Sequence, residues 1–202
     1  MNIYIQVVYT GNTKLPGGAL NTTEQGFEDM PVRNPDGTTG IKLHIDEGPR
    51  LNKTVNYTGS NFPELKQTCY ENSTKDRAGI YQLALIVSFD DEATRSKSGV
   101  AETPGRFLII QNNPVSGDAL VVHEILHNAV GVLPPDIDGR CENDQVHSCD
   151  GGYLYKGPVG GDPAFYTGEG DMRYLPLDIP EYIESNGFET NATSPTPRRA
   201  IK

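Results

Sequence analysis

The sequence contains no tryptophan, and its 202 residues include only three cysteines and four histidines. No two cysteines form the C-x-x-C pair that is typical of zinc fingers and zinc ribbons, which argues against a small structural zinc module. No apolar run approaches the roughly 18 residues that a membrane-spanning helix requires, so we expect no membrane span. A signal-peptide pattern is also absent, because a strand-like segment follows Met1 directly, as in a chain cut to its mature domain.

Basic residues are scarce relative to acidic ones. Lys and Arg number 17 against 27 Asp and Glu, which gives a formal net charge of −10 and a pI near 4.8. An acidic surface repels phosphate groups, so we expect neither nucleic acids nor anionic membranes as partners. With 22 Gly, 15 Pro and a hydrophobic content of 36%, the chain is expected to form one domain with a modest core and many loops.

Two of the cysteines lie close together in the sequence. Cys141 and Cys149 bracket a short polar segment that they are expected to close as a disulfide, which leaves Cys69 unpaired. The alternative is a second metal site made of Cys141, His147 and Cys149. N-x-S/T sequons occur five times, at Asn21, Asn52, Asn56, Asn72 and Asn191. Together these features favour an extracellular or cell-surface glycoprotein.

The order of the predicted elements indicates an α+β protein. Strand composition, alternating or continuously apolar, is found at residues 3–9, 41–46, 78–89 and 106–111, with an irregular edge segment at 99–105. Helix signals occur at residues 21–30, where Asn21 would cap the first turn, at 63–72, around 119–130 and at 178–187. We therefore expect a mixed, twisted β-sheet of about four to five strands packed on the helix at 119–130.

The predicted domain covers residues 1–190. Its sheet part spans residues 1–131, and its C-terminal part spans residues 132–190 and contains a long loop and the final helix. Residues 191–202 are polar and contain proline, so we expect them to form a flexible tail. The sequence assigns no oligomeric state.

The most specific pattern in the chain is H-E-x-x-H at His123, Glu124 and His127. On a helix, a spacing of four residues places both histidines on one face, where their rings can hold one Zn²⁺. Glu124 follows the first histidine and is placed to act as a base toward a water molecule that the metal polarises. The alternative interpretation is a buried amphipathic helix with two incidental histidines.

Apolar residues surround this motif on most sides of the helix, which predicts that the helix is buried. Two histidines and a glutamate in such a helix are costly unless they are paired, and coordination to a metal would provide the pairing. Gly131 is expected to end the helix, and the two prolines that follow, Pro134 and Pro135, prevent it from continuing.

A catalytic zinc site requires three protein ligands and one open position. His147 is the only histidine after the helix and is our preferred third ligand, with Asp136 and Asp138 as rivals and Glu142 as a weaker candidate. The remaining histidine, His44, lies at a polar position of a predicted strand, so we expect it to be a hydrogen-bonded surface residue. Calcium binding in the acidic loop is a weak expectation, because the Asp136-x-Asp138-Gly139 segment lacks the EF-hand spacing.

The order of strands, H-E-x-x-H helix, glycine stop and ligand loop resembles the zincin fold, and in particular the metzincin-like zinc proteases of secreted archaeal and bacterial type. That family pattern is H-E-x-x-H-x-x-G-x-x-H, or with Asp in the last place. The match here covers His123, Glu124 and His127, but the glycine is one residue late and Leu133 stands near the third-ligand position. The segment from Asp144 to His147 resembles the D-x-x-H stretch that follows the zinc helix in some relatives of this family.

The resemblance implies two further features. Met172 is a candidate for the methionine turn beneath the zinc, although a core methionine is an equally good interpretation. A phenol that stabilises an oxyanion is expected from one of several tyrosines, namely Tyr153, Tyr155, Tyr166 and Tyr174.

Taken together, the sequence predicts a zinc endopeptidase that acts on a protein or peptide substrate, with Glu124 as general base. One alternative is a zinc hydrolase that acts on another amide bond. The other is a non-catalytic surface or adhesion module with a zincin fold.

Overall fold

The computed structural model describes residues 1–73, 77, 79–89, 99–112, 117–133, 135, 140–149, 154 and 184, with the backbone alone at 117–119. The predicted final helix (except Glu184), the charged segment 90–98 and the tail 191–202 therefore lie outside the described residues.

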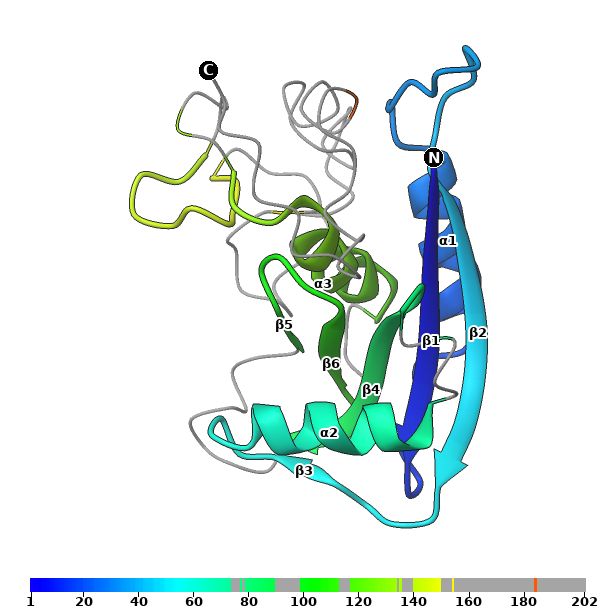
Figure 1. The fold of residues 1–202 in the computed structure, drawn as a ribbon, viewed down its shortest axis with the longest axis vertical. Helices are drawn as coiled ribbons and strands as arrows, with labels where there is room; N and C mark the ends of the chain where they lie inside the picture. The colour runs from blue at the N-terminus through cyan, green and yellow to red at the C-terminus, as the bar shows by residue number, and fades with distance from the viewer. Residues whose placement is uncertain are drawn as a thin grey trace.

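A mixed sheet forms the centre of the described part (Figure 1). Its strand order is β2 (Lys42–Leu51), β1 (Asn2–Thr10), β4 (Gln82–Phe89), β6 (Phe107–Gln111) and β5 (Gly99–Ala101). Neighbours from β2 to β6 are parallel, and β5 is antiparallel to β6 at the edge. A short strand, β3 (Asn56–Tyr57), pairs with the end of β4. The α+β class and the mixed sheet are thus confirmed. Strand β3, for which the sequence analysis predicted no strand, brings the described sheet to six strands.

Helices cover both faces of this sheet. On one face, α1 (Ala19–Glu28) and α3 (Gly117–Val130) share a hydrophobic cluster with the odd-numbered residues of β1, from Ile3 to Tyr9. On the other face, α2 (Phe62–Asn72) packs through Leu65 and Cys69 against β4 and β6. Strand β4 lies in the middle of the sheet and is buried on both faces, which explains its continuously apolar sequence.

Most predicted boundaries differ from the structure by one or two residues, and three of the differences have a clear physical reason. The predicted cap at Asn21 is wrong: α1 begins at Ala19, after Gly18 with a left-handed φ of 82°, and no side chain caps it. Strand β2 continues to Leu51 because it pairs with β1 along that whole length. Strand β4 begins at Gln82 rather than at residue 78, because the amides of Ile80 and Tyr81 bond the Arg77 carbonyl in a turn.

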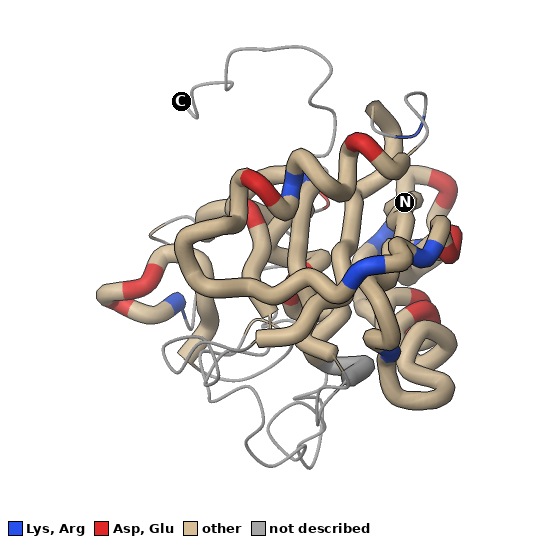
Figure 2. The backbone as a smooth tube through the Cα atoms, turned by 90° about the horizontal axis from the view of Figure 1, so that it is seen from below, with Lys and Arg blue, Asp and Glu red and all other residues tan. Residues whose placement is uncertain are grey.

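Charged residues are spread over several elements of the described part (Figure 2). His44 has the surface role predicted for it, since its Nε2 atom lies 2.9 Å from Asn2 Oδ1 and its ring stacks on Tyr4. Among the described residues, no helix is both long enough and apolar enough to cross a membrane.

Candidate metal centre

Helix α3 carries three of the predicted site residues into the core. His123 and Glu124 are each 3% exposed and His127 is 6% exposed. The helix is held there by apolar residues that are almost fully buried, namely Leu120, Val121, Val122, Ile125, Leu126, Ala129 and Val130. The packing of these residues on the sheet therefore fixes where the motif points.

The predicted end of the helix is confirmed. Gly131 has a φ of 75°, in the left-handed region, and its amide donates to the carbonyl of His127 at 3.2 Å. This turn redirects the chain, and the amide of Leu133 then bonds the carbonyl of Gln145 at 2.8 Å. The segment that contains His147 is thereby tied back to the end of α3.

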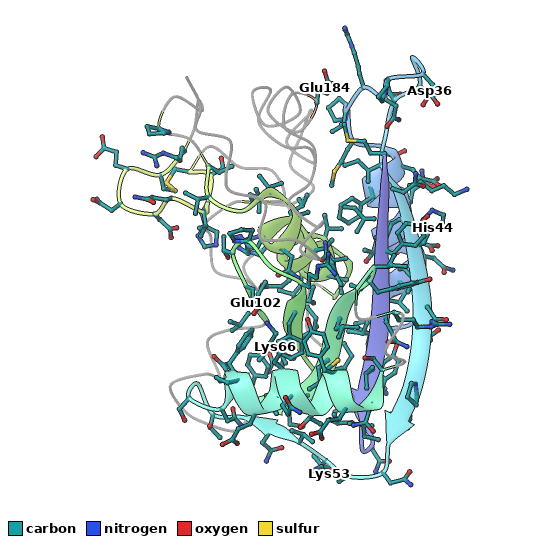
Figure 3. The ribbon with its side chains drawn as sticks, viewed as in Figure 1. Asp36, His44, Lys53, Lys66, Glu102 and Glu184 are labelled. Atoms are coloured by element: carbon teal, nitrogen blue, oxygen red, sulfur yellow. A yellow bond between two sulfur atoms is a disulfide. The ribbon has the colours of Figure 1, made fainter. Side chains whose placement is uncertain are left out.

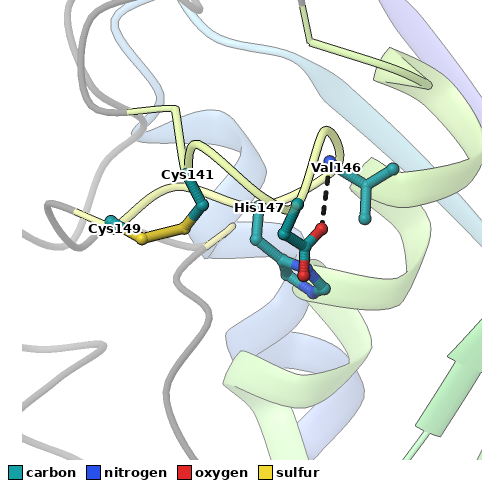
Figure 4. The surroundings of a disulfide bond; sticks show 5 residues. Cys141, Val146, His147 and Cys149 are labelled. Atoms are coloured by element: carbon teal, nitrogen blue, oxygen red, sulfur yellow. Dashed lines mark hydrogen bonds and ion pairs between the residues drawn. A yellow bond between two sulfur atoms is a disulfide. The ribbon is translucent and has the colours of Figure 1, made fainter.

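The predicted disulfide between Cys141 and Cys149 is present (Figure 4). The alternative metal site made of Cys141, His147 and Cys149 is therefore wrong, because bridged sulfurs have no thiolate to offer a metal. Inside the bridged segment, the Cys141 amide donates to the His147 carbonyl at 3.0 Å. Cys69 is a free thiol in α2, as predicted, and it is buried.

The ring nitrogens of three histidines converge. His127 Nε2 lies 2.9 Å from His123 Nε2 and 3.2 Å from His147 Nε2. Two nitrogens that bind one tetrahedral Zn²⁺ at about 2.0–2.1 Å are roughly 3.3 Å apart, close to both separations. Three histidine nitrogens are also a donor set that catalytic zinc takes. Burial, together with the neighbouring His123 and His147, lowers the pKa of His127, so its ring is neutral, as metal binding requires. The three residues therefore fit a zinc ion.

Asp144 orients the third histidine. Its Oδ2 atom lies 2.9 Å from His147 Nδ1, and its Oδ1 atom accepts the amide of Val146 at 3.3 Å. Because the carboxylate engages Nδ1, it leaves Nε2 as the nitrogen that faces the other rings. This role of Asp144 was not predicted, although the D-x-x-H spacing was the signal for it.

The side chain of Glu124 extends from α3 to the edge strand β5. Burial raises the pKa of its carboxyl group from 4.5 to about 8. An ideal Cβ built on Gly99 of β5 would be 2.5 Å from Oε1 of Glu124, so the carboxylate occupies the space that a side chain at position 99 would take. Sequence reasoning missed Gly99, because nothing local to it indicates this contact.

The structure thus brings together His123, His127 and His147, and Glu124, which follows His123 on α3, is buried. Glu142 is exposed and is not part of the group. The rivals Asp136 and Asp138 lie outside the described residues, as do Met172 and the tyrosines proposed for the oxyanion.

No protein-family model and no curated protein matches the chain. Similar solved structures include archaemetzincin and metalloproteinase-II. Archaemetzincin from Methanopyrus kandleri has 15% sequence identity and a TM-score of 0.41, over 69% of this chain and 79% of that chain. Metalloproteinase-II from Bacteroides fragilis has 11% identity and a TM-score of 0.50, over 91% of this chain and 52% of that chain, so this chain spans about half of that structure. The second likeness shows that this chain has a fold similar to that of metalloproteinase-II.

Proposed function

We propose that the protein is a zinc-dependent endopeptidase, with His123, His127 and His147 as zinc ligands and Glu124 as general base. The observation that carries the proposal is the convergence of three histidine Nε2 atoms at a helix that also carries the buried Glu124, the residue after His123. A purely structural zinc site has no use for such a carboxylate, which favours an enzyme over a non-catalytic module. The likeness in fold to a metalloproteinase supports the same reading.

Bound zinc would supply a Lewis acid that activates a water molecule and polarises the scissile carbonyl. Glu124 accepts a proton from the attacking water and passes it to the leaving amine, which makes it first a base and then an acid. Its burial suits this exchange, because a carboxylate in a water-poor setting binds a proton more readily than an exposed one. Asp144 holds the His147 ring in the orientation that binding requires.

Strand β5 is proposed to bind the substrate. It is the last strand on the sheet path of the described residues, and Gly99 within it contacts Glu124. An extended peptide can add to a sheet edge through main-chain hydrogen bonds, and this edge would place a peptide bond near the carboxylate. This placement favours a peptide over the other amide substrates.

Metal content tests the ligand set. We expect about one zinc per chain in wild type and a clear loss in His147→Ala, measured by elemental analysis after purification without added metal. His44→Ala is the matched control, because His44 lies on β2 (Figure 3), an edge strand of the sheet, and is not part of the group of three histidines. This variant should leave the zinc content unchanged. Full zinc in His147→Ala would instead indicate Asp136 or Asp138 as the third ligand.

Turnover tests the base. Glu124→Gln should keep its zinc and lose peptide cleavage by a factor of about 100 or more, because the amide cannot take the proton. Cleavage of an unstructured protein substrate by wild type and by this variant gives the comparison. A wild-type protein that holds zinc and cleaves no peptide would overturn the proposed function, and a Glu124→Gln variant as active as wild type would remove Glu124 from its role.

A further inference from the structure

We propose that Gly99 is a positioning residue: by lacking a side chain, it gives the Glu124 carboxylate the space in which that group meets the reacting atoms. This inference rests on the proposed function and deepens it. Its evidence is a contact between two elements, the edge strand β5 and the helix α3.

The contact leaves no room for a methyl group. An ideal Cβ on Gly99 would lie 2.5 Å from Oε1, 2.7 Å from Cγ and 2.8 Å from Cδ of Glu124. All three atoms belong to the one side chain, so a substitution at position 99 acts first on the carboxylate arm. Since Glu124 is 3% exposed, its neighbours leave the displaced group little space.

The backbone conformation at position 99 does not require a glycine. The φ of Gly99 is not in the left-handed region, so an L-residue can adopt the same conformation without strain. Glycine is also unfavourable within a strand, because it has the most conformational freedom to lose on folding and no side chain to pack. A glycine at this position is therefore explained by the space that it leaves for Glu124.

The strand cannot easily withdraw to make room. Gly99 pairs with Ile110, and the turn that follows β5 is closed by Glu102, whose Oε2 atom accepts the amides of Arg106 and Phe107 at 3.0 and 3.1 Å. The Gly105 amide donates to the Asn128 carbonyl at 3.2 Å, which ties the same turn to α3. Because the pairing with Ile110 and this turn hold β5 in place, we expect a new methyl group to move the carboxylate rather than the strand.

Steady-state kinetics of the full chain test the catalytic consequence. In Gly99→Ala we expect kcat to fall by roughly 10- to 100-fold, with KM within about threefold of wild type and full zinc content, because a base moved by about 1 Å loses its alignment. Gly48→Ala is the matched control: Gly48 also lies in a strand and contacts a side chain, Gln6, but β2 is at the opposite edge of the sheet. A change in KM alone would mean that Gly99 acts on the substrate and would overturn the proposal.

A double variant tests whether the effect passes through Glu124. If it does, Gly99→Ala should cause no further loss in a Glu124→Gln background, where the base is already absent. An additional loss in that background equal to the loss in wild type would contradict the proposal, because the methyl group would then be acting elsewhere.

Thermal unfolding of the metal-free protein supplies a test that needs no activity. In a Glu124→Ala background the space at position 99 is open, so the Tm change caused by Gly99→Ala should be about 3 °C more favourable there than in the wild-type background, where the methyl group meets Glu124. Equal Tm changes in the two backgrounds would refute the contact itself. An inactive wild type with intact coupling would instead refute the proposed function, so the two failures are distinguishable.

Discussion

The His147 Nδ1 atom lies 2.9 Å from Asp144 Oδ2, while Nε2 of the same ring lies 3.2 Å from His127 Nε2. One carboxylate thus decides which nitrogen of His147 is available to a metal. Loss of such a hydrogen bond typically lowers metal affinity by about 10- to 100-fold.

Asp144→Ala is therefore expected to weaken zinc binding by about 10- to 100-fold, and Asp144→Asn by less, because its amide oxygen can still accept from Nδ1–H. Competition with a chromogenic chelator measures both affinities. Glu142→Gln is the matched control, since Glu142 is an exposed carboxylate in the same bridged segment. Equal affinity in Asp144→Ala and wild type would contradict the orienting role.

The disulfide between Cys141 and Cys149 encloses His147 and is expected to lower the entropy cost of bringing it to the other histidines. Replacing both cysteines by Ser should weaken zinc binding and lower the free energy of unfolding by about 2–3 kcal/mol. Chelator competition and denaturant titration measure the two effects. Cys69→Ala is the control: it keeps the bridge, so this variant should lose stability but not zinc affinity. If the double Ser variant bound zinc as tightly as wild type, the bridge would have no role at the site.

Glu102 closes the turn between β5 and β6 by accepting two backbone amides, and it also pairs with Lys66 of α2 (Figure 3). Glu102→Ala leaves both amides without this acceptor and should lower the free energy of unfolding by about 1–3 kcal/mol. Lys66→Met removes only a partly exposed ion pair, which is worth about 0–1 kcal/mol. Urea denaturation of the two variants compares them, and equal losses would assign the stability to the ion pair instead.

Burial raises the pKa of the Cys69 thiol from 9.0 to about 12. The native thiol therefore stays neutral and covered at pH 8. A chromogenic aromatic disulfide should react with it only after unfolding, and should then detect one thiol per chain in non-reducing denaturant. Because the folded-state pKa is the higher one, the stability from this burial is present below about pH 9 and is lost as the pH rises through about 12. Rapid reaction of the native protein at pH 8 would contradict the buried position.

Local pattern was enough to predict several parts of this protein. The spacing of His123 and His127, the apolar cover of their helix and the stop at Gly131 all follow from interactions within a few residues along the chain. The strands β1, β4 and β6 were predicted because alternation and continuous apolar runs report directly on burial. The predicted cap at Asn21 was wrong, because α1 begins after the left-handed Gly18 and no side chain caps it.

The sequence by itself determined the chemistry that is available: two histidines one turn apart, a carboxylate beside them and only one later histidine. Only the tertiary structure decided how these groups meet. The 3.2 Å approach of His147 to His127 depends on the turn at Gly131, the bond from Leu133 to Gln145 and the disulfide. The contact of Gly99 with Glu124 depends on β5 being docked at the sheet edge against α3. Both contacts join residues 20 or more positions apart, where no periodicity in the sequence reports which side chains become neighbours.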